Sequence, residues 1–391
     1  MSKRIAILGS TGSIGQSALR VISGLGAEYE VFALSAHRNV ELLAEQAERF
    51  RPKFVGVADV DCAKQLEKSV RGLGMEVLAG PESLRQIAEL EQVDIVLSAV
   101  VGAAGLGPAL AAARRGKRLA IANKEPLVIA GRQLTEAAKA SGATILPVDS
   151  EHSAIFQVLH CGRRQDVSKI ILTSSGGPLR GARVDDLQNV TLEQAMAHPV
   201  WDMGPKITVD SATMMNKALE IIEARWLFDI PVDKIEVLIH PESIVHSLVE
   251  FVDGSMVAQL GEPDMCLPIQ YALTYPKRVN GISKHLKLED IGRLTFEKPN
   301  METFRALSLA YEVGGTGGTA AAVFNAANEA AVEEFLAGEI RFVEIIELVE
   351  RCLNKHDAKM DATLEELLEA DAWARREIKG SIKRRTKSLK R

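Results

Sequence analysis

Short apolar runs alternate with helical patterns over the first 150 residues. We expect buried strands at the six apolar runs 4–8, 31–34, 54–57, 94–98, 118–121 and 144–148. Between several of these runs apolar residues recur at helical spacing, for example over 40–50 and 108–115. Alternation of strands and helices predicts parallel pairing with right-handed crossovers. Residues 1–149 are therefore expected to form an α/β domain around a doubly wound, Rossmann-type sheet.

The pattern changes near residue 149. Strands are expected at 235–239, 245–251 and 256–260, and the dipeptide Asp253-Gly254 between the last two indicates a hairpin turn. A polar stretch with Gly and Pro follows, and residues 320–337 and 343–353 then show helical periodicity. These changes predict an α+β domain over 150–285, a linker over 286–311 and a C-terminal helical domain over 312–391.

Composition and charge exclude several classes of protein. The 391 residues include 47 Lys and Arg against 52 Asp and Glu, a formal net charge of −5 that offers no basic field to a nucleic acid. Basic residues from Arg375 onward are interpreted as a solvated helix end, with nucleic-acid binding as the alternative. Because no apolar run reaches about 18 residues, we expect no membrane span.

The cysteines and the N-terminus bear on the cellular compartment. The four cysteines show no paired spacing and are interpreted as reduced thiols: Cys62, Cys161, Cys266 and Cys352. The first predicted strand begins almost at once, which leaves no room for a signal peptide. We therefore expect a cytoplasmic protein.

A glycine-rich turn joins the first strand to the first helix. Its G-x-x-G-x-x-G spacing is a variant of the dinucleotide fingerprint, in which glycines bring the backbone close to a pyrophosphate at a helix N-terminus. A structural strand–helix turn is the alternative. The residues expected to contact the cofactor here are Gly9, Thr11, Gly12, Ser13, Ile14 and Gly15.

The end of the second strand indicates which dinucleotide is bound. The sequence there runs Ala36-His37-Arg38-Asn39 and lacks the carboxylate that accepts from an NAD ribose. Because Arg38 and His37 suit a 2′-phosphate, NADPH is favoured over NAD. The alternative is that Arg38 is a solvated surface charge.

Polar residues also follow the later strands, where the carboxyl ends of a parallel sheet bind ligands. The small residues 101–105 follow the fourth strand, and Asn123, Lys124 and Glu125 follow the fifth. Asp149 and Glu151 close the sixth strand, where residues two apart on an extended chain point to one side. Two converging carboxylates suit a hard divalent ion such as Mg²⁺ or Mn²⁺. The alternative is that Glu151 caps a helix and His152 packs.

Two further segments combine polar groups with helix or turn signals. Residues 210–220 predict a helix that runs to about residue 228 and carries Asn216, Lys217 and Glu220 on one face. That group fits a site for a metal and a phosphate, and an exposed Lys217–Glu220 ion pair is the alternative. Residues 173–178 combine hydroxyls with adjacent glycines that can cradle a phosphate. Residues 198–204 fit a lid over a substrate or a plain surface loop.

Together these segments resemble the 1-deoxy-D-xylulose 5-phosphate reductoisomerase family, in order, from residue 3 to about 340. The resemblance rests on the glycine turn and on seven further motifs: residues 123–125, 147–152, 175–178, 209–223, 240–246, 261–265 and 325–329. Val200, Pro126 and the pair His37-Arg38 depart from the pattern of that family, and the last departure concerns the 2′-phosphate contacts.

The resemblance implies roles for residues in several of these segments. Asp149, Glu151 and Glu220 would be the metal ligands, for Mg²⁺ or Mn²⁺ with Co²⁺ as an alternative, and Lys124 would act beside them in catalysis. Gly204 would join the cofactor contacts, together with Asn123, Lys124 and Glu125. The residues that would bind the sugar-phosphate substrate are Ser150, Glu151, Ser175, His198, Trp201, Ser211, Asn216, Lys217 and Glu220.

The resemblance further implies a homodimer that converts 1-deoxy-D-xylulose 5-phosphate to 2-C-methyl-D-erythritol 4-phosphate. A metal-assisted retro-aldol and aldol rearrangement would precede hydride transfer from NADPH, as a step of isoprenoid precursor synthesis. Two alternatives stay open. One is an NADP-dependent dehydrogenase with an unbranched product and no metal requirement, and the other is an NADPH-binding sensor without turnover.

Overall fold

The computed structural model describes residues 2–201 and 203–389. The chain folds into two compact units. The first unit comprises Met1–Pro126, Arg132–Ser153 and Asp264–His285, and the second comprises Leu127–Gly131, Ala154–Pro263 and Leu286–Arg391. Among the described helices, none has both the length and the hydropathy that crossing a membrane would require.

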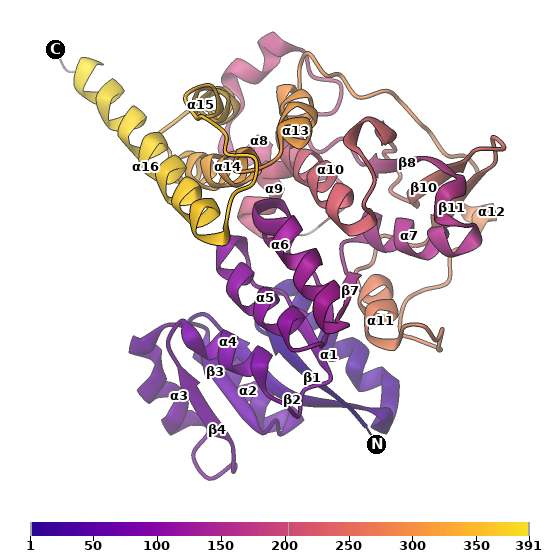
Figure 1. The fold of residues 1–391 in the computed structure, drawn as a ribbon, viewed down its shortest axis with the longest axis vertical. Helices are drawn as coiled ribbons and strands as arrows, with labels where there is room; N and C mark the ends of the chain where they lie inside the picture. Colours follow the sequence, from indigo (N-terminus) through magenta and orange to yellow (C-terminus); the bar gives the residue numbers. More distant parts are fainter. Residues whose placement is uncertain (1, 202, 390–391) are drawn as a thin grey trace. The chain divides into compact units, whose positions relative to one another are not determined.

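A seven-stranded parallel sheet forms the centre of the first unit (Figure 1), in the order β4-β3-β2-β1-β5-β6-β7. Six strands confirm the sequence prediction, although their ends shift by a few residues. The prediction missed β4, a four-residue strand at the sheet edge whose apolar run is only three residues long and whose side chains are at most half-buried. The bounds are β1 Lys3–Leu8, β2 Tyr29–Ala36, β3 Phe54–Val57, β4 Glu76–Ala79, β5 Ile95–Ser98, β6 Arg118–Ile121 and β7 Thr144–Pro147.

The order of the strands reverses beside β1, which pairs with β2 on one side and β5 on the other. Sheets of this kind bind ligands at such a switch point, beyond the carboxyl ends of the strands. The predicted glycine turn follows β1 and therefore lies at this point. The helices of the unit are α1 Ser13–Leu25, α2 Val40–Phe50, α3 Ala63–Ser69, α4 Glu82–Glu89, α5 Leu106–Arg114, most of α6 Glu125–Ser141, the start of α7 Ser150–Val158, and α11 Cys266–Thr274.

The second unit contains a four-stranded mixed sheet in the order β11-β10-β8-β9. β8 and β9 are parallel, and β10 runs antiparallel to both of its neighbours. The predicted bounds of the last three strands and the hairpin at Asp253-Gly254 are confirmed, with Gly254 in the left-handed region (φ 84°). The strands are β8 Val167–Ser174, β9 Ile235–Ile239, β10 Val245–Phe251 and β11 Met256–Leu260.

Two helices stand where the sequence predicts one. α9 covers Pro205–Ala212 and α10 covers Met215–Phe228, and Met214 between them adopts a left-handed conformation (φ 61°). The sequence predicted one helix from residue 210 to about 228, and its end is confirmed at Phe228. Its start was wrong, because no glycine or proline in the sequence marks the break at Met214. α10 is buried on most of its surface, and Met215, Leu219 and Ile222 lie in the core of the unit.

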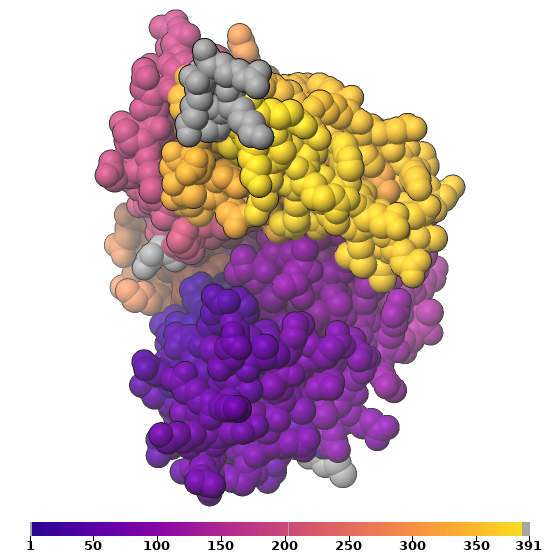
Figure 2. Space-filling view, turned by 90° about the vertical axis from the view of Figure 1, so that its left-hand side faces the viewer, coloured from indigo at the N-terminus to yellow at the C-terminus, as the bar shows by residue number. Residues whose placement is uncertain are grey.

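Helices complete the second unit towards the C-terminus. The helical patterns at 320–337 and 343–353 are confirmed as α14 and α15, and the basic tail is part of α16. Figure 2 shows the yellow atoms of α16 against orange atoms of the preceding helices, consistent with the packing of α16 on α14. The bounds are α8 Leu192–Met196, α12 Leu288–Ile291, α13 Arg305–Thr316, α14 Ala320–Leu336, α15 Phe342–Asn354 and α16 Leu364–Leu389.

Candidate active site

The glycine turn at residues 9–15 is shaped by two close approaches of the backbone. Gly9 has φ 85°, and a methyl group on it would lie 2.5 Å from the carbonyl oxygen of Ala99. A methyl group on Gly15 would lie 2.4 Å from the carbonyl oxygen of Gly9. Both distances exclude any other residue, so these glycines are required by the turn itself. Gly12 is the N-cap of α1, and the first amides of the helix follow it at Ser13, Ile14 and Gly15.

A buried glutamine holds this turn in place. The Nε2 of Gln46 donates to the carbonyl oxygen of Ser10 at 3.0 Å, and its Oε1 accepts from Ser10 Oγ at 2.7 Å. The amides of Gly9 and Ser10 both donate to the carbonyl oxygen of Ser35. The sequence analysis missed Gln46, which lies on α2 among charged residues and has no motif of its own. Its role follows only from the packing of α2 beside β1 and β2.

The residues after β2 occupy the position that a ribose phosphate would approach. Ala36 is buried, and the exposed Arg38 places Nε 2.5 Å from Asp59 Oδ2. This pairing raises the pKa of Arg38 and lowers the pKa of Asp59. Asn39 caps α2 by accepting from the amide of Leu42. A carboxylate thus lies beside the predicted 2′-phosphate residue after all, supplied by the loop after β3.

Asn123, Lys124 and Glu125 follow β6 and are all less than a tenth exposed. Asn123 Oδ1 accepts from Ser98 Oγ at 3.0 Å. A methyl group on Gly105 would lie 2.2 Å from Asn123 Nδ2, so the small residue at this position makes room for the asparagine. Asn123 Nδ2 is buried and has no hydrogen-bond partner among the described residues, which leaves a donor for a ligand at this rim.

A lysine and two carboxylates meet at the end of β7. Lys124 Nζ lies 3.0 Å from Asp149 Oδ2, and the Nδ1 of the buried His152 lies 3.3 Å from Asp149 Oδ1. Oxygen atoms of Asp149 and Glu151 approach within 4.8 Å of each other. The convergence of the two acids is confirmed, but the predicted extended chain is wrong because α7 begins at Ser150. Ser150 Oγ donates to Glu151 Oε2.

In the second unit, α10 carries a buried carboxylate with two polar partners. Glu220 is 0% exposed, its Oε1 accepts from Asn216 Nδ2 at 2.7 Å, and its Oε2 lies 2.5 Å from Lys217 Nζ. The exposed ion pair that the sequence allowed is excluded, since Lys217 is only 2% exposed. A buried carboxylate needs such partners to remain charged. Glu223, one turn further along α10, is also buried, and the sequence analysis did not single it out.

The hydroxyl–glycine segment after β8 lies against the end of α9. Gly176 and Gly177 both have positive φ, and their amides donate to Ser174 Oγ and Ser175 Oγ. A methyl group on Gly177 would lie 2.4 Å from the carbonyl oxygen of Ser211, so the two backbones are in direct contact. The structure therefore brings Ser175 and Ser211 into neighbouring turns of one unit.

His198 ties the predicted lid segment to this turn. Its Nδ1 accepts from the amides of Val200 and Trp201 at 3.2 and 2.9 Å, and its Nε2 lies 3.1 Å from Ser175 Oγ. Because Nδ1 accepts from two amides, the ring proton is on Nε2, which donates to the serine. Burial lowers the pKa of His198, which favours this neutral form. Trp201 is half-buried, and Gly204 is the N-cap of α9. Asp202 in the same segment lies outside the described residues.

The two histidines around β10 are buried, and the contacts of His240 are structural. Its Nε2 accepts from the amides of Ile244 and Val245, and its Nδ1 donates to the carbonyl oxygen of Thr295. These bonds hold the segment after β9 against the linker. Neither His240 nor His246 was among the expected ligands.

Family models and relatives identify the chain. Models for 1-deoxy-D-xylulose 5-phosphate reductoisomerase and for its two C-terminal domains match residues 5–131, 145–228 and 260–377. A 1-deoxy-D-xylulose 5-phosphate reductoisomerase of Trichlorobacter lovleyi is 50% identical over 373 residues, which cover 95% of this chain and 96% of the relative. One from Pelodictyon phaeoclathratiforme is 50% identical over 380 residues, covering 97% and 100%.

Solved structures agree with the sequence relatives. The reductoisomerase from Zymomonas mobilis in complex with NADPH is 42% identical with a TM-score of 0.92, and 98% of this chain and 99% of that one are covered. A DOX-P reductoisomerase in complex with NADPH, fosmidomycin and magnesium has the same identity and TM-score, with 97% and 98% covered. The chain belongs to the 1-deoxy-D-xylulose 5-phosphate reductoisomerase family.

Proposed function

We propose that the chain converts 1-deoxy-D-xylulose 5-phosphate to 2-C-methyl-D-erythritol 4-phosphate with NADPH. The reaction breaks one carbon–carbon bond and forms another, and a hydride with one proton then reduces the resulting aldehyde. Membership of the family supports this proposal. The structural observation that carries it is the pairing of two converging acids after β7 with a glycine turn at the end of β1, within one parallel sheet.

NADPH is assigned to the switch point of that sheet. The amides at the start of α1 face the position of a pyrophosphate, and the helix dipole favours its negative charge. Arg38 and His37 would meet the 2′-phosphate, and the buried Nδ2 of Asn123 would donate to the cofactor at the adjoining rim. The magnesium and NADPH complexes of the related structures support the same cofactors here.

The divalent ion is assigned to Asp149, Glu151 and Glu220. All three donors are carboxylate oxygens, which are the ligands that Mg²⁺ and Mn²⁺ prefer, and Co²⁺ accepts them as well. When bound, such an ion supplies Lewis-acid stabilisation to the oxygens of the substrate. Lys124 lies 3.0 Å from Asp149, so its ammonium group can hold a proton at the edge of the carboxylate pair. Ser150 would touch the hydroxyls of the substrate from the first turn of α7.

The substrate phosphate is assigned to Ser175, Ser211, Asn216 and Lys217 of the second unit. Two hydroxyls, one amide and one ammonium group form a donor set that matches a phosphate dianion. His198 would close the lid segment over it, because the ring already bonds both that segment and Ser175. Trp201 would exclude water. Holding both fragments of a cleaved ketose in place can remove roughly 7–11 kcal/mol of barrier.

The remaining assignments concern organisation. We propose a cytoplasmic homodimer in which residues 150–285 carry catalysis and dimer contacts, residues 286–311 link, and residues 312–391 form the helical domain. The four cysteines, all free, agree with a reducing compartment.

The test is one incubation of the purified chain with the ketose phosphate, NADPH and Mn²⁺, followed by absorbance at 340 nm. We expect NADPH loss that a chelator abolishes and excess Mn²⁺ restores, with a branched polyol phosphate as product. Loss that persists with chelator and yields an unbranched product would favour a simple dehydrogenase. Tight NADPH binding without any turnover would favour a sensor.

A further inference from the structure

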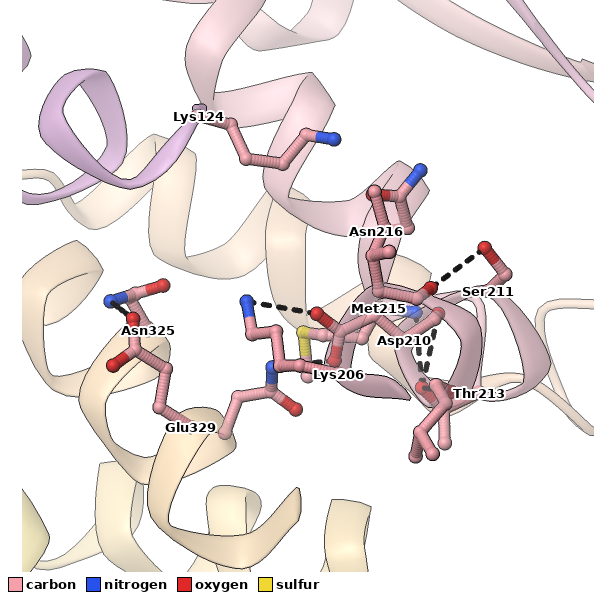
Figure 3. Close-up of polar contacts among 12 residues, drawn as sticks. Lys124, Lys206, Asp210, Ser211, Thr213, Met215, Asn216, Asn325 and Glu329 are labelled. Carbon is pink, nitrogen blue, oxygen red and sulfur yellow. Dashed lines mark hydrogen bonds and ion pairs between the residues drawn. The ribbon is translucent and has the colours of Figure 1, made fainter. Parts of the chain in front are cut away.

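Asp210 is a buried carboxylate next to the proposed phosphate-binding residues and outside the metal set. It lies on α9, one residue before Ser211, and is 1% exposed. Its Oδ2 lies 2.9 Å from Lys206 Nζ on the same helix, and its Oδ1 accepts from Asn328 Nδ2 of α14 at 2.8 Å. Figure 3 shows Lys206 and Asp210 paired on α9. Both carboxylate oxygens are therefore engaged by other side chains.

Asn328 belongs to the motif at residues 325–329, which the sequence analysis identified without a function. In the same motif Asn325 Nδ2 donates to Glu329 Oε1 at 3.0 Å (Figure 3), and Glu329 Oε2 lies 2.7 Å from Arg375 Nη2 of α16. The motif thus connects α14 to α9 through one asparagine and to α16 through its glutamate. Polar contacts therefore join α14 both to α16 and to α9, the helix that carries Ser211 near its C-terminal end.

These contacts cost more free energy than simple packing would. Asn325 and Asn328 are 0% exposed, and the Oδ1 atom of each has no hydrogen-bond partner among the described residues. Burying a carboxylate and two amides that each lack one hydrogen bond costs desolvation free energy. Apolar side chains could pack the two helices together without that loss. The polar contact is therefore better explained by the orientation it imposes on α9 than by stability.

The orientation of α9 is passed on to the phosphate-binding residues through a tight turn. Thr213 Oγ1 donates to the carbonyl oxygens of Val209 and Asp210 and accepts from the amide of Met215. Met214 is left-handed, so α10 starts at an angle fixed by this turn. A shift of Asp210 would move Ser211 against Gly177 and would move the start of α10, which carries Asn216 and Lys217.

We propose that Asp210 is a positioning residue for the substrate phosphate, acting through Asn328 and Lys206. The proposal rests on the proposed function, since it takes Ser211, Asn216 and Lys217 as the phosphate-binding residues. Asp210 itself does not touch the phosphate, because its negative charge would repel the dianion and both of its oxygens are occupied.

The first test measures KM and kcat for the ketose phosphate in Asp210→Asn. This variant keeps the shape and an acceptor for Asn328 but removes the charge that pairs with Lys206. We expect KM to rise about tenfold, the size of one weakened charged hydrogen bond, with kcat within about twofold of the wild type. The dissociation constant for NADPH should not change. The matched control is Asp229→Asn, whose side chain is 95% exposed at the end of α10 and should change neither parameter.

A second variant, Asn328→Ala, removes only the contact between α9 and α14 and is expected to act in the same direction. If Asp210→Asn does not fold, the same measurements on Asn328→Ala test the proposal. Combining either change with Lys217→Gln gives a double variant. Its loss of transition-state stabilisation, measured from kcat/KM, should be smaller than the sum of the losses in the two single variants, because both substitutions act on the same phosphate.

The outcomes separate the two proposals. Suppose that the wild-type chain turns over, and that both variants lower kcat or the melting temperature but leave KM unchanged. This result overturns the positioning role alone. Strict additivity with Lys217→Gln also overturns it. A wild-type chain without turnover overturns the proposed function and the positioning role together.

Discussion

The glycine turn after β1 and the turn between α9 and α10 are both assigned to phosphate groups, yet they are built differently. The first is made of backbone: Gly9 and Gly15 are fixed by contacts that leave no space for a side chain. The second is made of buried polar side chains around a left-handed methionine, with Asp210, Lys217 and Glu220 each 2% exposed or less. A backbone site depends on space, whereas a side-chain site depends on balanced charge.

The difference predicts how each region fails. Adding one carbon atom should break the glycine turn and leave the charged cluster intact. Removing one charge should break the cluster and leave nucleotide binding intact. Variants that affect both functions together would show that the two regions do not act separately.

The largest effect is expected for Glu220→Gln, which removes a metal-ligand charge while keeping the side-chain shape. We expect kcat/KM to fall by about 10³-fold, because Lewis-acid stabilisation is worth several kcal/mol. The dissociation constant for NADPH, measured by fluorescence titration, should not change. Glu236→Gln, on the exposed face of β9, is the matched control and should retain full activity.

Gly15→Ala should have the next largest effect, and it should act on NADPH binding rather than on the metal site. Its methyl group would lie 2.4 Å from the carbonyl oxygen of Gly9, so the turn must open. We expect a cost of about 1–3 kcal/mol in unfolding free energy, as for other overpacked sites, and an NADPH dissociation constant at least about tenfold higher. Gly107→Ala on α5, where a methyl group meets nothing within 4 Å, should be neutral or slightly stabilising. Equal behaviour of the two variants would contradict the backbone account.

A smaller effect is expected for Arg38→Ala, which tests the cofactor preference. The side chain is exposed, so solvent screens its charge. We expect KM for NADPH to rise about five- to tenfold, as for one lost charge-assisted contact, while KM for NADH stays the same. Asp59→Asn releases Arg38 from its partner and should not raise KM for NADPH. An equal rise in KM for NADPH and for NADH would show that Arg38 does not contact the 2′-phosphate.

The smallest effect concerns the titration of His198. Burial lowers its pKa below the ordinary 6.5, so the folded protein favours the neutral ring. Its contribution to stability is complete above pH 6.5 and is lost as the pH falls from there through the folded-state pKa. An NMR titration, assigned with His198→Gln, should find a pKa below 6.5. A value at or above 6.5 would mean that the ring is not held neutral by the lid segment.

The sequence predicted the parallel sheet and the glycine turn because their signals are local. Apolar runs mark the buried strands, and glycine spacing marks a turn that no other residue can form. It missed β4, which is short and half-exposed at an edge, and it missed Gln46, whose role depends on packing between elements. Both omissions concern residues whose importance arises only in three dimensions.

The candidate site was predicted less completely for the same reason. The acids at Asp149, Glu151 and Glu220 were found from motif and spacing, but the break at Met214 was not, because a left-handed methionine has no sequence signal. Nor could the burial of Asp210 be foreseen, since its partner Asn328 on α14 lies 118 positions away. The function of the motif at 325–329 follows only from that distant contact.

The most direct test of the account is a crystal structure of the chain grown with Mn²⁺ and NADPH, with anomalous data collected at the manganese absorption edge. The account predicts one strong peak bonded to carboxylate oxygens of Asp149, Glu151 and Glu220, with the nicotinamide ring facing it. A peak bonded to other residues, or none in a crystal that holds NADPH, would contradict it.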